Sequence, residues 1–148
     1  MPDVYVIMGD GNTRKSATIR ALTGAFQRGL YQVATRNAGV IDIFVQISAL
    51  QESKISPQQF IQEVTQNNYQ HILVSLWISQ GGRQPSGQDY IRNFLNAGWN
   101  ILEILVLGTA TLSYNLPPGS PPPNYIPNSR NLPANQIASQ IRTWWQWL

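Results

Sequence analysis

The sequence predicts an α/β protein, a three-layer sandwich in which helices cover both faces of a mainly parallel central sheet. Strand-like segments alternate along the chain with segments whose apolar residues have helical spacing. The segments 71–77 and 100–107 are almost continuously apolar, which is typical of strands buried on both faces. The alternation implies right-handed crossovers between parallel strands.

Composition predicts one domain spanning residues 1–148, with 43% apolar residues to build a core. Only 11% of the residues are charged, the net charge is +3, and the basic residues are scattered, so a nucleic-acid partner is not expected. No apolar stretch is long enough to span a bilayer, and the N-terminus lacks the pattern of a secretory signal. With no cysteine, disulfides and thiolate chemistry are excluded, and we expect a cytoplasmic protein without a membrane partner.

The first strand is predicted over 4–8, where β-branched and apolar residues run up to Gly9. A polar loop follows, and a helix is predicted from Ser16, with Thr18 facing outward and with Gly24 or Gly29 ending it. Its expected inner face consists of Ile19, Leu22 and Phe26.

The loop after this strand resembles the Walker A motif of the P-loop NTPases. That motif has Gly in the first place, Lys in the seventh and Ser or Thr in the eighth, and Gly9, Lys15 and Ser16 occupy these places. The sixth place, normally the second glycine, holds Arg14. The resemblance implies a P-loop fold and a ligand-binding loop that consists of Gly9, Asp10, Gly11, Asn12, Thr13, Arg14, Lys15 and Ser16.

The resemblance also implies roles for these residues. Backbone N–H groups of the loop and of the helix N-terminus would hold the phosphates of ATP or of another phosphorylated ligand. Lys15 would reach the outer phosphates from a solvated loop, and the Ser16 hydroxyl would coordinate Mg²⁺. Arg14 either reshapes the loop or is itself a phosphate ligand, because a guanidinium binds phosphate bidentately. The alternative is a polar turn whose Lys and Ser are merely solvated.

The middle of the chain continues the alternation. The segment 30–36 is ambiguous, but a turn at Asn37–Gly39 allows it to form a hairpin with a strand predicted over 40–47. Ser56-Pro57 has the signature of a helix start, and this helix is predicted to run to about Asn67.

The strand 71–77 leads into a glycine-rich loop over 79–87, which is followed by a helix that Gly98 closes and by the strand 100–107. The inner face of that helix is expected to consist of Tyr90, Ile91, Phe94 and Leu95.

Seven prolines between 116 and 133 exclude regular helix and central strand, so this segment is predicted to cross the surface in an extended form. The alternative is that it binds an aromatic groove on a partner. A C-terminal helix is predicted over 134–148, with Trp147 away from its apolar face. Trp147 either packs beneath the proline-rich segment, which we favour, or contacts a protein partner or a second copy.

Phosphoryl chemistry in P-loop proteins needs an acid at the end of a strand beside the loop, and none is visible. Asp10, Glu52 and Asp89 are the acids that loops could bring near the site. The segment 48–52 also falls where small GTPases carry Asp-x-x-Gly-Gln, but this chain lacks the Asp and the Gly there, and no guanine-reading motif follows 107.

The sequence therefore predicts a protein that binds a nucleotide or another phosphate ligand with weak or no hydrolysis. One alternative is a degenerate P-loop scaffold that acts as a protein-interaction module through the proline-rich segment and the terminal tryptophans. A second alternative is a small-molecule kinase in which Arg83 belongs to a mobile lid. Whether the protein is an enzyme stays open.

Overall fold

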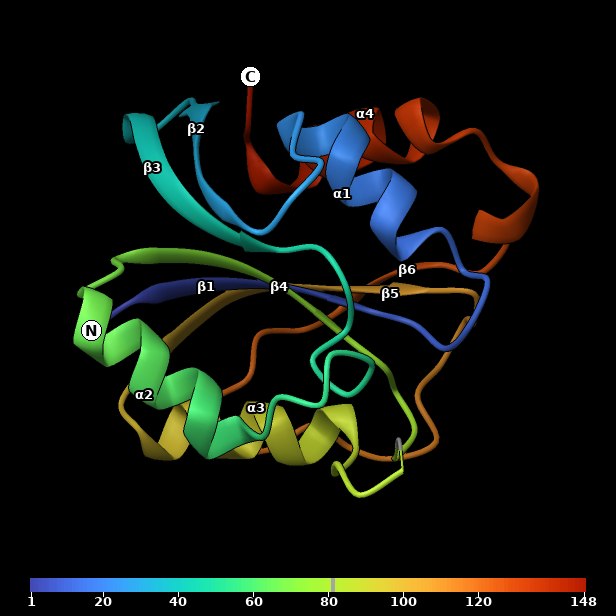
Figure 1. Cartoon of the computed structure of the whole chain (residues 1–148). Helices are drawn as coiled ribbons and strands as arrows, with labels where there is room; N and C mark the ends of the chain where they lie inside the picture. Colours follow the sequence, from blue (N-terminus) through green and yellow to red (C-terminus); the bar gives the residue numbers. More distant parts are fainter. Residues whose placement is uncertain (81) are drawn as a thin grey trace.

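A computed structural model describes residues 1–80 and 82–148 of the chain. Its sheet has the strand order β2-β3-β4-β1-β5-β6, and all neighbours are parallel except the antiparallel pair β2 and β3 (Figure 1). The strands are β1 (Asp3–Met8), β2 (Gly29–Thr35), β3 (Gly39–Gln46), β4 (His71–Leu76), β5 (Asn100–Leu107) and β6 (Asn124–Ile126). The predicted mainly parallel sheet is confirmed, with β1 in its interior.

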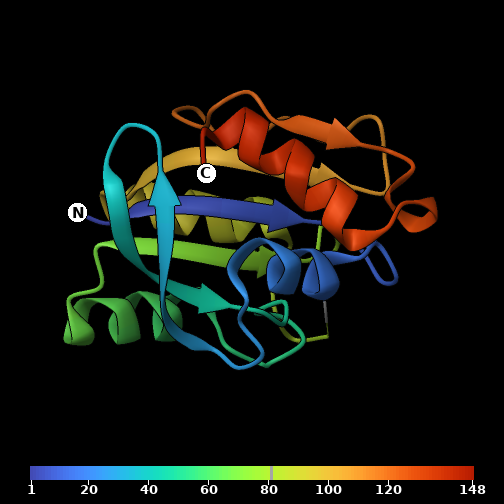
Figure 2. The same ribbon diagram turned by 90° about the horizontal axis from the view of Figure 1, so that it is seen from above.

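Over the described residues, four α-helices form the two outer layers. Figures 1 and 2 show one pair of helices on each face of the sheet. Helices α1 (Lys15–Thr23) and α4 (Ala134–Trp145) cover one face, and α2 (Pro57–Asn67) and α3 (Gly87–Asn96) cover the other. The side chains of β1 alternate between the two cores: Tyr5 and Ile7 pack under α1 and α4, whereas Val4, Val6 and Met8 pack under α2 and α3. The predicted three layers are confirmed.

The predicted start of α2 is confirmed in detail. The Ser56 hydroxyl accepts a hydrogen bond from the Gln59 N–H (3.1 Å), and the Gln59 side chain accepts one from the Ser56 N–H (2.8 Å), which is a capping box. Pro57 occupies the first helical position, where no N–H is needed. Helix α3 likewise follows a serine cap, Ser86. A glycine-rich loop was predicted over 79–87, before α3, and position 81 of this loop lies outside the described residues.

Helix α1 ends at Gly24, one of the two glycines predicted to end it, but the predicted positions of two side chains are wrong. Gly24 ends it in the left-handed conformation (φ 77°), so Phe26 lies beyond the helix and is 78% exposed instead of lining its inner face. Thr18 is fully buried, not outward-facing, because α4 packs across α1.

The proline-rich segment is confirmed as an extended connection, with one regular piece at the sheet edge. Strand β6 pairs in parallel with β5 over three residues, as a proline-flanked edge strand can. A 3₁₀ turn, Ser129–Asn131, follows and leads the chain back across the carboxyl edge of the sheet to α4 (Figure 2).

The favoured placement of Trp147 beneath the proline-rich segment is wrong. Gln146 adopts the left-handed conformation (φ 57°) and turns the chain back onto the sheet, where Trp147 pairs with Thr35. Its ring lies 5.0 Å from Tyr5 and 5.3 Å from Trp145, centroid to centroid, and is 3% exposed. Because Trp145 is also buried, a protein or homo-oligomer contact through this helix would depend on the half-buried Trp144.

Over the described residues, none of the helices combines the length and the apolarity that crossing a membrane requires.

Candidate functional site

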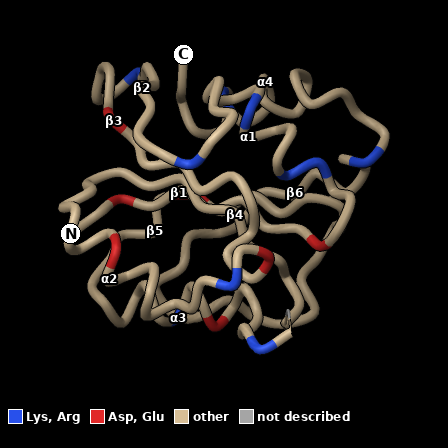
Figure 3. Tube along the Cα trace, viewed as in Figure 1, with Lys and Arg blue, Asp and Glu red and all other residues tan. Residues whose placement is uncertain are grey.

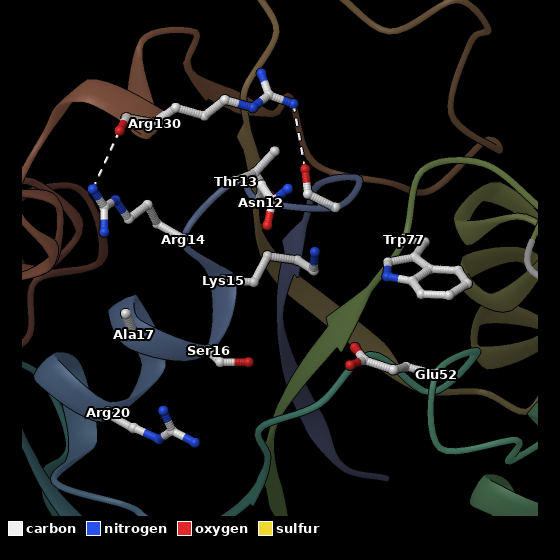
Figure 4. Close-up of a pocket in the computed structure, with 11 residues that line it drawn as sticks. Asn12, Thr13, Arg14, Lys15, Ser16, Ala17, Arg20, Glu52, Trp77 and Arg130 are labelled. Atoms are coloured by element: carbon white, nitrogen blue, oxygen red, sulfur yellow. Dashed lines mark hydrogen bonds between the residues drawn. The ribbon is translucent and has the colours of Figure 1, made fainter.

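The loop between β1 and α1 borders a cavity of about 720 Å³ at the carboxyl edge of the sheet (Figure 4). Of the eight residues predicted from the sequence, six line this cavity, whereas Gly9 and Asp10 do not. The full lining is Gly11, Asn12, Thr13, Arg14, Lys15, Ser16, Ala17, Arg20, Glu52, Trp77 and Arg130. The structure thus brings the predicted loop together with five residues outside the motif: Ala17, Arg20, Glu52, Trp77 and Arg130.

The backbone of the loop is sharply curved. Asn12 (φ 62°) and Arg14 (φ 74°, ψ 19°) both adopt the left-handed conformation. This conformation costs a residue with a Cβ about 1–2 kcal/mol, but it costs glycine nothing comparable. Arg14 therefore occupies a backbone conformation that suits the glycine found in the sixth place of the motif. Gly9 is needed for a different reason, because a Cβ there would collide with the Thr13 hydroxyl.

The first N–H groups of α1 have no hydrogen-bond acceptor among the described residues. Arg14 is the N-cap residue and offers no side-chain cap, and the first helical hydrogen bond runs from the Thr18 N–H to the Arg14 carbonyl (2.9 Å). Among the described residues, none accepts a hydrogen bond from the backbone N–H groups of residues 11–17. Converging free N–H groups at a helix N-terminus favour an anion.

Lys15 is buried, which corrects the expectation of a solvated loop lysine. It is the first residue of α1 and is only 8% exposed, because its side chain turns back under the loop. Its Nζ donates to the Asp10 carbonyl (3.0 Å), which also accepts from the Thr13 hydroxyl (2.7 Å). Burial lowers the pKa of Lys15, and Glu52 and Asp10 partly counteract this by favouring the charged form. An anion in the cavity would therefore stabilise this desolvated ammonium.

The Arg14 side chain points away from Lys15 toward the proline-rich segment (Figure 4). Its guanidinium donates to the Arg130 carbonyl (3.3 Å). In this arrangement the side chain fastens the loop to a remote segment. Its role as a phosphate ligand stays a prediction.

The proline-rich segment contributes two residues that contact the loop and that sequence reasoning missed. The buried Ser129 hydroxyl donates to the Thr13 carbonyl (3.0 Å), and the Arg130 guanidinium donates to the Gly11 carbonyl (3.4 Å). More than a hundred residues separate the two partners of each hydrogen bond, so no local sequence pattern predicts these contacts. One sequence signal could have indicated Arg130. It is an arginine in the segment that has to cross the carboxyl edge of the sheet before α4 begins.

The cavity is strongly basic. Four cations line it, against Glu52 as the one acid among the described lining residues, and Figure 3 shows the basic positions along α1 and on the segment after β6. The four cations are Arg14, Lys15, Arg20 and Arg130. Arg20 belongs to α1 and follows Ser16 by one turn, so helical spacing places both on the same side. Such a concentration of positive charge favours an anion over a cation.

The three acids predicted to lie near the site differ in their positions and partners. Glu52 lines the cavity, as predicted for a loop acid near the site. The Asp10 carboxylate instead accepts hydrogen bonds from the N–H groups of Ile78 (3.2 Å) and Ser79 (3.1 Å) and from the Ser79 hydroxyl (3.0 Å). Asp89 forms an ion pair with Arg92 (2.6 Å).

The neighbours of β1 supply no acid at their carboxyl ends. Strand β4 ends at Leu76 and is followed by Trp77, and β5 ends at Leu107 and is followed by Gly108. The hairpin of β2 and β3 is confirmed, but β4 lies between β3 and β1, so the segment 48–52 follows a strand that does not touch β1. Within the described residues no cluster of three or more His, Cys, Asp or Glu could hold a metal ion.

Arg83, the predicted lid residue, lies beside this cavity rather than in it. It lines a neighbouring cavity of about 580 Å³. The two cavities share Glu52 and Trp77 in their walls.

Comparison with protein-family models, with curated protein sequences and with solved structures gives no significant match to this chain.

Proposed function

We propose that the chain binds the phosphate groups of a nucleotide or of a related ligand in the cavity beside the 9–16 loop, with weak or no hydrolysis. The observation that carries this proposal is the cavity wall itself. It combines four cations with a row of free backbone N–H groups at the start of α1. A polyphosphate offers several acceptor oxygens to such a wall and makes charge-assisted hydrogen bonds with it.

Lys15 is the central cation in this proposal. Its Nζ has three donors, and one of them holds the Asp10 carbonyl. The other two are available to an oxygen of the ligand. Because the ammonium is already desolvated, binding an anion removes little further water from it, so its charge interacts strongly with a phosphate.

Ser16 and Glu52 are the residues that fit a magnesium ion. A hydroxyl and a carboxylate in one cavity wall are hard oxygen ligands, and Mg²⁺ in nucleotide sites usually keeps several waters and binds phosphate oxygens as well. The ion would neutralise phosphate charge beside Glu52. The absence of an acid at the ends of β4 and β5 is the reason for proposing weak hydrolysis, since no carboxylate there can orient water.

The test is a thermal-shift and calorimetric titration with pyrophosphate and with ATP, each with and without Mg²⁺. A ligand that binds only the folded protein adds about 2.7 kcal/mol of stability at a hundred times its dissociation constant. Wild-type protein should show a shift, and Lys15→Met should lose it. Methionine is chosen because Lys15 is buried, and an apolar side chain of similar length avoids the cavity that alanine would leave.

Arg36→Met is the matched control. It removes one positive charge from an exposed turn outside the cavity and should leave binding unchanged. If millimolar pyrophosphate and ATP leave the melting temperature and the heat of mixing of wild-type protein unchanged, phosphate binding is refuted. The scaffold alternative would then be the better account.

A further inference from the structure

A second cavity adjoins the phosphate-binding loop and shares a wall with it. Its volume is about 580 Å³, and its wall is more apolar than that of the first cavity. It is lined by Gln51, Glu52, Lys54, Trp77, Gly82, Arg83 and Gln84. Because Glu52 and Trp77 face both cavities, one ligand can extend from the loop into this second space.

Trp77 is held firmly by its backbone while its ring stays accessible. The buried Gln51 side chain donates to the Trp77 carbonyl (3.1 Å) and accepts from the Trp77 N–H (3.0 Å). On the other side, α3 begins so close that a Cβ on Gly87 would collide with the Trp77 carbonyl. The indole itself is half-buried and lies across the first cavity from Lys15 (Figure 4).

An accessible indole fixed beside a phosphate site is suited to a flat aromatic ring. Stacking of a base on an aromatic side chain strengthens binding and needs no sequence-specific hydrogen bond. Arg83 in the same cavity carries a planar guanidinium, which also stacks on aromatic rings. The wall thus offers an aromatic and a cationic surface to one ring.

We propose that the second cavity receives the base of a nucleoside di- or triphosphate, stacked on Trp77, while the phosphates lie at the loop. This proposal rests on the proposed function and extends it from a phosphate site to a nucleotide site. It assigns Trp77 the part of a base-stacking residue. The competing occupant is a separate acceptor molecule for phosphoryl transfer, in which case Trp77 would not contribute to nucleotide affinity.

The experiment compares ATP with pyrophosphate on wild-type protein and on Trp77→Leu, by calorimetric titration. Leucine keeps an apolar side chain but cannot stack. ATP affinity should fall on the order of tenfold in Trp77→Leu, whereas pyrophosphate affinity should not change. Trp77→Phe should restore most of the ATP affinity, because an aromatic ring is present again. Trp144→Leu, which changes another half-buried tryptophan outside both cavities, should have no effect on either ligand.

Several results would overturn the proposal. If wild-type protein binds pyrophosphate as tightly as ATP, or if Trp77→Leu binds ATP normally, the base makes no contact with Trp77 and phosphate binding stands alone. If Trp77→Leu loses ATP and pyrophosphate equally, Trp77 supports the loop instead of stacking on a base. If neither ligand binds to wild-type protein, the proposed function itself fails and this proposal fails with it.

Tryptophan fluorescence gives an independent readout. ATP should quench the emission of wild-type protein, pyrophosphate should not, and the ATP quench should disappear in Trp77→Phe. The other tryptophans are poor reporters of this ligand, because Trp99, Trp145 and Trp147 are buried in the cores and Trp144 lines a separate cavity between α4 and β6. A quench that persists in Trp77→Phe would contradict the stacking.

Discussion

Helices α1 and α2 both follow a strand of the parallel sheet, but their first turns are completed differently. In α2, Ser56 and Gln59 satisfy each other's N–H groups, and Pro57 has none to satisfy. In α1, Arg14 caps nothing, the N–H groups of residues 15–17 find no protein acceptor among the described residues, and Lys15 is buried. The N–H groups at a helix start are satisfied by side-chain caps, by water or by a ligand. The start of α1 has no side-chain cap and is surrounded by cations, an arrangement that suits the anion of the proposed function.

Of the variants that separate the two helix starts, Arg130→Ala should have the largest effect, and this effect should be on ligand affinity. It removes a cavity cation and the bond to the Gly11 carbonyl, so pyrophosphate affinity should fall on the order of tenfold, since a charged hydrogen bond contributes about 1.5–3 kcal/mol. Calorimetric titration measures the effect, with the exposed Arg92→Ala on α3 as the control. Unchanged affinity in Arg130→Ala would remove the proline-rich segment from the site.

Ser56→Ala should affect only stability. It deletes the cap of α2 and should lower the free energy of unfolding by about 1 kcal/mol. Urea denaturation measures this change. Pyrophosphate affinity should be unchanged, because the capping box of α2 lies outside the cavity wall. A weaker affinity in Ser56→Ala would mean that the two helix starts are not independent.

Arg14 allows a comparison of two small side chains at one left-handed position. Arg14→Gly and Arg14→Ala both lose the bond to Arg130, but only glycine accepts φ 74° without strain. Arg14→Gly should therefore be the more stable variant, by about 1 kcal/mol, in urea denaturation. In binding, Arg14→Ala should be weaker than wild type if Arg14 is a phosphate ligand, and Arg14→Gly should be stronger if Arg14 only obstructs the loop. Equal affinities in all three proteins would exclude both roles.

The smallest expected effect is a dependence of stability on pH through Lys15. Burial lowers its pKa in the folded state below the ordinary value of 10.5, so above that lowered pKa the unfolded chain binds more protons. The free energy of unfolding of wild type, measured relative to Lys15→Met, should therefore rise as pH rises through the lowered pKa toward 10.5. Urea denaturation between pH 7 and about 10.5 tests this. A relative stability that falls over this range would contradict the buried charge.

Local signals predicted the closed helix start more completely than the open one. Ser56, Pro57 and Gln59 are neighbours in sequence, so the cap of α2 can be read directly. For α1 the motif located the loop, but it did not predict the burial of Lys15, because burial depends on how the side chain turns under the loop.

The walls of the cavities show the same limit. Arg130 and Trp77 reach the cavity from other strands and loops, and only the assembled sheet brings them together. The direction of Trp147 depended on one residue, Gln146, whose left-handed conformation no pattern in the sequence indicated.

Asp10 gives the two cavities a common mechanical connection. Its carbonyl oxygen accepts hydrogen bonds from Lys15 and Thr13, which line the first cavity, and its carboxylate accepts them from Ile78 and Ser79, the residues directly after Trp77. We predict that a ligand which orders the residues on one side also restricts those on the other side through Asp10. In thermodynamic terms this is a coupling free energy, which is reciprocal by necessity. Pyrophosphate and adenosine, offered as separate molecules, should each raise the affinity of the protein for the other.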